Sequence, residues 1–93
     1  MALSARAQYI IKEVLTDDKK SGPELIAAIA SPAALSTRTK RRIKIAFGDV
    51  TAANEFINAV QTAGHQALSA RTKDYVVVAF HDASAAAEII AAI

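Results

Sequence analysis

Residues 67–93 read ALSARTKDYVVVAFHDASAAAEIIAAI, and residues 34–60 read ALSTRTKRRIKIAFGDVTAANEFINAV. The two stretches align without a gap and match at 14 of 27 positions. A third copy, residues 2–29, aligns with them once one extra residue near Gly22 is allowed. The chain is therefore three tandem copies of a unit of about 33 residues, and such a repeat constrains the fold before any other feature does.

Some of the matching residues are distinctive. Each copy begins Ala-Leu-Ser, has Arg at the fifth position, Asp at a central break and Glu early in its second half. The repeated residues are Ser4, Ser36 and Ser69; Arg6, Arg38 and Arg71; Asp17, Asp49 and Asp82; and Glu24, Glu55 and Glu88. Arg offers a fork that matches a carboxylate, so we expect ion pairs within or between units. For the serines we expect helix caps or turns.

The second half of each unit is predicted to be a helix. Asp49 and Asp82 precede apolar residues at helical spacing, and an Asp at that place can accept hydrogen bonds from the first free N–H groups of a helix. In the first copy Pro23 stands where a first-turn proline is tolerated. The predicted helices cover residues 23–30, 51–63 and 83–93.

The first half of each unit is ambiguous. Residues 41–47 alternate polar and apolar, which is typical of a strand, and residues 75–80 read Tyr-Val-Val-Val-Ala-Phe, which is β-prone. Residues 5–15 favour a helix. The positions that stay apolar in all copies nevertheless recur at i, i+3 and i+4, a helical pattern. They are Ile11/Ile43/Val76, Val14/Ala46/Ala79 and Leu15/Phe47/Phe80.

We predict one α+β domain over residues 1–93, with helices in the first copy followed by two strand–helix units. The strands are expected at 41–47 and 74–80, with residues 66–70 pairing as a hairpin strand against the last of them. The alternative is an all-α fold of three αα-hairpins, six short helices in total.

Composition excludes several classes of protein. More than half of the 93 residues are hydrophobic, which excludes a disordered chain, and a net charge of +2 gives no strong overall field toward nucleic acid or membranes. The chain has no cysteine, hence no disulfide, thiolate metal site or cysteine nucleophile. Neither a signal peptide nor a run of about 18 apolar residues is present, so we expect a soluble, non-secreted protein without membrane contact.

No pattern of catalytic residues is evident. The repeated serines lack a Ser-His-Asp arrangement, and there is neither a P-loop nor a glycine-rich dinucleotide turn. His65 and His81 have no metal-ligand partner at helical spacing. We predict no enzyme activity and no catalytic, cofactor-binding or metal site.

One run of basic residues could contact phosphate. It comprises Arg38, Lys40, Arg41, Arg42 and Lys44. Cations so spaced suit a nucleic-acid backbone or an acidic partner protein. No aromatic platform is interleaved with them, and the third copy has Asp74 and Tyr75 in place of two of the arginines. Nucleic-acid binding is therefore our second hypothesis.

The apolar end of the chain favours assembly. The last residues are Ile89-Ile90-Ala91-Ala92-Ile93, whereas repeat arrays normally carry polar capping units. This helix must be covered by the first copy or by another subunit. Cores built from small side chains also recruit more core by oligomerising. We predict self-association, with Phe56, Ile89, Ile90 and Ile93 as the assembly surface.

The unit also carries a family resemblance. LSTRTKRRIKIAFGD followed by AANEFI resembles a short module repeated in uncharacterised virion proteins of tailed bacteriophages. The resemblance covers residues 35–60 and 68–93 well and 3–29 loosely. It implies a structural role as a capsid decoration, cement or tail-associated subunit. It also implies other virion proteins or further copies of the chain as partners, and a place in the virion or, during assembly, in the host cytoplasm. It implies no catalytic residues.

Overall fold

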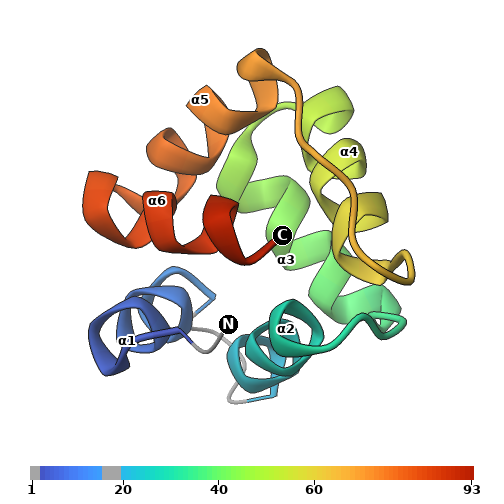
Figure 1. Ribbon diagram of the computed structural model, residues 1–93, viewed down its shortest axis with the longest axis horizontal. Helices are drawn as coiled ribbons and strands as arrows, with labels where there is room; N and C mark the ends of the chain where they lie inside the picture. Colours follow the sequence, from blue (N-terminus) through green and yellow to red (C-terminus); the bar gives the residue numbers. More distant parts are fainter. Residues whose placement is uncertain (1–2, 16–19) are drawn as a thin grey trace.

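The computed structural model of the chain describes residues 3–15 and 20–93. These residues form six α-helices and no β-strand (Figure 1). The helices are α1 (Ala5–Val14), α2 (Ser21–Ala30), α3 (Thr37–Phe47), α4 (Val50–Gln61), α5 (Ala70–Phe80) and α6 (Ala83–Ala92). Each repeat unit is one pair of helices, an αα-hairpin.

The α+β prediction is therefore wrong, and the all-α alternative agrees with the structure. Residues 41–47 belong to α3 and residues 74–80 to α5, while residues 66–69 precede α5 without regular structure. The shared apolar positions explain this outcome, because Ile43, Val76 and Phe80 are all buried. Only a helix places their i, i+3, i+4 spacing on one face, and β propensity yields to such packing.

Side-chain caps define where the described helices begin, except for α2, which has no side-chain cap. The first helix of every hairpin starts after a serine whose hydroxyl accepts the N–H three residues on; these are Ser4, Ser36 and Ser69. Asp49 and Asp82 cap α4 and α6 in the same way, as predicted. Each such cap satisfies a backbone donor that the helix itself leaves free.

The turns inside the second and third hairpins are short. Gly48 ends α3 at φ 69° and His81 ends α5 at φ 55°, both in the left-handed region, and an aspartate cap follows each at once. Left-handed residues commonly close helices because they turn the chain sharply. Both hairpins thereby acquire nearly the same geometry, although the two end residues differ.

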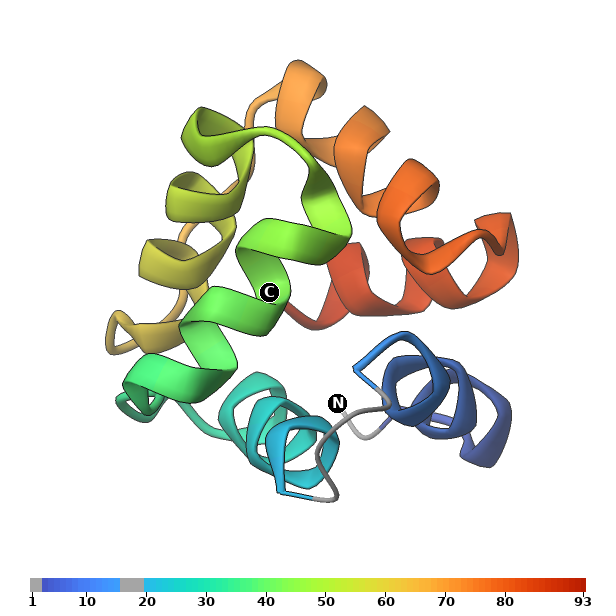
Figure 2. The same ribbon diagram turned by 180° about the vertical axis from the view of Figure 1, so that it is seen from behind.

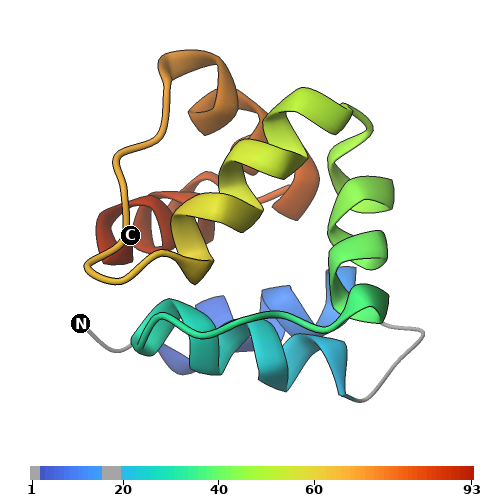
Figure 3. The same cartoon turned by 90° about the vertical axis from the view of Figure 1, so that its right-hand side faces the viewer.

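The three hairpins close into a ring. Helix α2 packs against α3, α4 against α5, and α6 back against α1. The same junction thus recurs three times around the ring, so the three hairpins are related by a pseudo-threefold axis, and α5 also contacts both α1 and α3. Figure 2 shows the arrangement from behind. The segment after α2 runs back along that helix before α3 begins (Figure 3). The apolar α6 is thus covered by the first copy of the unit.

Aromatic side chains fill the middle of the ring. The centroid of the Phe47 ring lies 5.1 Å from that of Phe56 and 6.3 Å from that of Phe80, in tilted and edge-on arrangements. Leu15, Phe47 and Phe80 occupy the same position in the three units, and all are buried. One core therefore joins all three hairpins.

Candidate functional site

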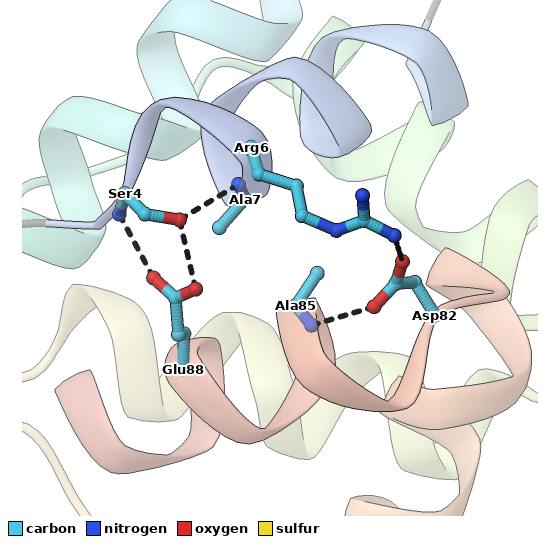
Figure 4. Close-up of polar contacts among 6 residues, drawn as sticks. All are labelled: Ser4, Arg6, Ala7, Asp82, Ala85 and Glu88. Atoms are coloured by element: carbon cyan, nitrogen blue, oxygen red, sulfur yellow. Dashed lines mark hydrogen bonds and ion pairs between the residues drawn. The ribbon is translucent and has the colours of Figure 1, made fainter.

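The repeated glutamates connect neighbouring hairpins. The carboxylate of Glu88, on α6, accepts hydrogen bonds from the backbone N–H and the hydroxyl of Ser4, both at 2.8 Å (Figure 4). Glu55 accepts from the N–H of Ser69 at 3.2 Å and from its hydroxyl at 2.7 Å. Glu24 accepts from the N–H of Ser36 at 2.6 Å. Each glutamate thus holds the cap of the next hairpin around the ring.

The repeated arginines form ion pairs between units, one of the two arrangements we expected. Arg6 Nη2 lies 2.5 Å from Asp82 Oδ2, and Arg71 Nη2 lies 2.6 Å from Asp49 Oδ2. Arg71 also lies over the ring of Tyr75, 5.0 Å from its centroid, where the guanidinium meets the negative face of the ring. Asp17, which occupies the same place in the first unit as Asp49 and Asp82, lies outside the described residues.

These contacts favour the charged forms of the acids. The N–H of Ala52 and then the Arg71 guanidinium lower the pKa of Asp49, and Ala85 and Arg6 do the same for Asp82. Hydrogen bonds from the hydroxyls of Thr72 and Ser69 lower the pKa of Glu55. The N–H and hydroxyl of Ser4 lower that of Glu88. The repeated polar residues are therefore engaged in holding the ring together.

The four residues predicted to form an assembly surface are wholly or partly buried in the core. Phe56 and Ile89 are 0% exposed, and Ile90 and Ile93 are partly buried against the core. The pseudo-threefold closure turns the apolar face of α6 inward. In the folded chain Phe56 and Ile89 hold the core together and are not available to a partner.

A different apolar surface lies where α1, α3 and α5 converge. It is a groove of about 590 Å³. Its lining residues are Tyr9, Ile10, Glu13, Val14, Ile45, Ala46, Ala79, Phe80 and His81. Phe80 and Ala79 belong to the buried core, so the floor of the groove is the outer surface of that core. The groove lies on the pseudo-threefold axis.

Large apolar side chains stand exposed around this groove. Among the lining residues, Ile45 is 69% exposed and Tyr9 62%; Val78, which corresponds to Ile45 in the third unit, is 58% exposed. Ile45 and Val78 occupy the same position of the repeat as Glu13, so this position is not preserved among the units. Exposed apolar groups clustered beside a concavity are typical of an interaction site.

Sequence analysis did not identify this groove. The signal was present, because Ile45 and Val78 are apolar residues outside the shared i, i+3, i+4 stripe. Interpreting residues 41–47 and 74–80 as strands hid it, since a strand would have placed these residues on its buried face. On a helix the same residues lie on the solvent side.

The basic run contributes a second, smaller hollow at the start of α3. Thr37, Arg38, Arg41 and Arg42 line a space of about 410 Å³. The structure thus brings three of the five predicted phosphate-contacting residues together. Lys44 is exposed and Lys40 half-buried, and neither lines the hollow.

The positions of the two histidines give little indication of a function. His65 Nε2 lies 3.2 Å from the carbonyl oxygen of Ala28, and His81 is one of the residues that line the groove. Within residues 3–15 and 20–93, no three His, Cys, Asp or Glu side chains are grouped so as to hold a metal ion. None of the helices in this part of the chain is both long and apolar enough to span a bilayer.

Comparison with models of known protein families, with curated proteins and with solved structures found no match to this chain.

Proposed function

We propose that this protein is a non-enzymatic assembly protein that acts through protein–protein contacts made by the groove face. By groove face we mean the groove on the pseudo-threefold axis together with Tyr9, Ile45 and Val78 around it. The exposure of these three side chains is the observation that carries the proposal. A monomeric protein rarely leaves apolar side chains clustered in this way unless they bind something.

The architecture behind this face supports the proposal. The face is carried by α1, α3 and α5. Each of these helices begins after an N-cap serine that donates a hydrogen bond to a glutamate of the preceding hairpin in the ring. A face held this firmly need not be ordered on binding, which lowers the entropic cost of association.

The resemblance to repeated modules of tailed-phage virion proteins supports a more specific proposal. The chain would be a capsid decoration, cement or tail-associated subunit, found in the virion or, during assembly, in the host cytoplasm. Its partners would be other virion proteins or further copies of itself. An assembly role of this kind needs a rigid body and an apolar face, and it needs no active site.

Mass spectrometry of purified particles of a phage that encodes this chain tests the virion proposal. We expect the chain at a fixed, multiple copy number per particle, retained through density-gradient purification. Absence from the particles, with the chain present in the infected cell, would contradict the virion part of the proposal.

A second candidate function rests on the hollow at the start of α3. Arg38, Arg41 and Arg42 share one surface there, which suits the phosphates of nucleic acid or an acidic partner protein. A salt titration of DNA binding tests it: affinity must fall steeply with salt and be lost in the variant Arg41→Glu plus Arg42→Glu. No binding at low salt would remove this candidate.

A further inference from the structure

We propose that the groove face binds a second copy of this chain, so that two molecules associate about a twofold axis with their grooves facing. This inference rests on the proposed assembly function and names its first partner. It follows from the shape of the face, its exposed apolar side chains and its distribution of charge.

The charges around the groove divide by helix. Glu13 of α1 lines the groove, and the base Arg41 of α3 and the acid Asp74 of α5 occupy the same position of the repeat as Tyr9, which also lines it. These three side chains are exposed, and within the described parts of the chain none of them makes an ion pair or hydrogen bond. The charged side chains of the groove face therefore have no ionic or hydrogen-bonding partner among the described residues.

Such a division makes the face complementary to itself. A twofold interface uses the same patch on both molecules, so each patch must carry both halves of every contact. A rotation that places Glu13 of one copy against Arg41 of the other satisfies both charges in both copies. A face of uniform charge would instead repel its copy.

The apolar contact fits the same arrangement. Ile45 lies at the rim of the groove on α3, and Arg41 lies one turn before it on the same side of the helix. If Ile45 of a second copy enters the groove, Arg41 of that copy comes alongside Glu13 of the first. The twofold axis then repeats both contacts, and two of the most exposed apolar side chains become buried.

Sedimentation equilibrium of the purified full chain, over roughly 10 to 500 µM, tests this proposal, because weak homodimers dissociate in the micromolar range. We expect a monomer–dimer equilibrium. Ile45→Glu should weaken dimerisation about tenfold or more, since a charge would then enter an apolar groove. The matched control is Val50→Glu, because Val50 is equally exposed at 63% but lies at the start of α4, away from the groove.

A charge exchange makes the test specific for the predicted contact. Glu13→Arg and Arg41→Glu should each weaken the dimer severalfold by placing like charges together, and the double variant should restore it. Circular dichroism and thermal unfolding of each variant confirm that the exposed substitutions leave the fold intact.

Three results would overturn the proposal. They are a wild-type chain that stays monomeric across the range, a dimer indifferent to Ile45→Glu, and a double charge exchange that fails to rescue. A monomeric chain that is nonetheless present in purified particles would overturn this inference alone, because the groove face would then serve a different protein. A chain that dimerises as described but is absent from particles would contradict only the virion proposal.

Discussion

The junctions between hairpins and the groove face share one pseudo-threefold axis but differ in how faithfully they repeat. At the junctions the same chemistry recurs: Glu88 holds Ser4 as Glu55 holds Ser69, and Arg6 pairs with Asp82 as Arg71 pairs with Asp49. On the groove face the corresponding positions differ in every copy. One position of the repeat holds Tyr9, Arg41 and Asp74 in the three copies, and another holds Glu13, Ile45 and Val78.

This difference separates the residues that hold the ring together from the residues whose side chains are available to bind a partner. A junction residue is fixed by a partner in the next unit, so the same residue serves in all three places. A solvent-facing residue near the axis has no such constraint. Its divergence breaks the symmetry of the face: Glu13 and Asp74 are acidic, Arg41 is basic, and Ile45 and Val78 are apolar.

The largest effect should come from the core that both regions share. Phe56 is 0% exposed and its ring packs against that of Phe47. Phe56→Ala should lower the free energy of unfolding by about 3–5 kcal/mol, through lost burial and the cavity left behind. Chemical denaturation measures this loss, with Val50→Ala as the exposed control. A loss below about 1 kcal/mol would mean that the three hairpins do not share one core.

The next largest effect compares two junctions directly. Ser4→Ala and Ser69→Ala each remove a helix cap and a hydrogen bond to the glutamate of the preceding hairpin in the ring. Each should cost about 1–2 kcal/mol, the usual loss for a capping serine. Equal losses mean that the α6–α1 junction closes the ring as firmly as α4–α5. A clearly smaller loss from Ser4→Ala than from Ser69→Ala, limited to the cap itself, would mean that the ring is open at α6–α1 in solution.

How much of this fold could be predicted depends on which signal is followed. The repeat, the aspartate caps and the second helix of each hairpin follow from the sequence alone, because each is local. Residues 75–80 mislead for a physical reason: Tyr-Val-Val-Val is β-prone by itself, whereas the fold depends on Val76, Ala79 and Phe80 meeting the other hairpins. Only the comparison of all three copies contains that tertiary information.

The candidate site was less predictable still. Phe56 and Ile89 looked like an assembly surface because an apolar helix stands at the end of the sequence. The closure of α6 on α1 that buries them is a long-range event that no local pattern reveals. The groove likewise arises from residues on three helices that lie far apart in the sequence.

Acid should weaken the junctions between the hairpins. Asp49, Asp82, Glu55 and Glu88 have pKa values below their ordinary 3.8 and 4.5, so the folded chain binds fewer protons than the unfolded one. The stability they contribute is complete above those ordinary values and is lost as pH falls through the lowered ones. Thermal unfolding between pH 7 and strongly acid conditions should show this loss, reduced in Glu88→Gln. An unchanged melting temperature through this range would contradict it.

The smallest effect on stability should come from the groove face itself. Ile45→Glu places a charge on a side chain that is 69% exposed, so the free energy of unfolding of the monomer should change by no more than about 0.5 kcal/mol. Denaturation at a concentration well below dimerisation measures this without interference from association. Val50→Glu should behave alike there, although only Ile45→Glu affects self-association. A loss above about 1 kcal/mol from Ile45→Glu alone would show that the groove face contributes to the core as the junctions do, and the separation between structural and functional positions would not hold.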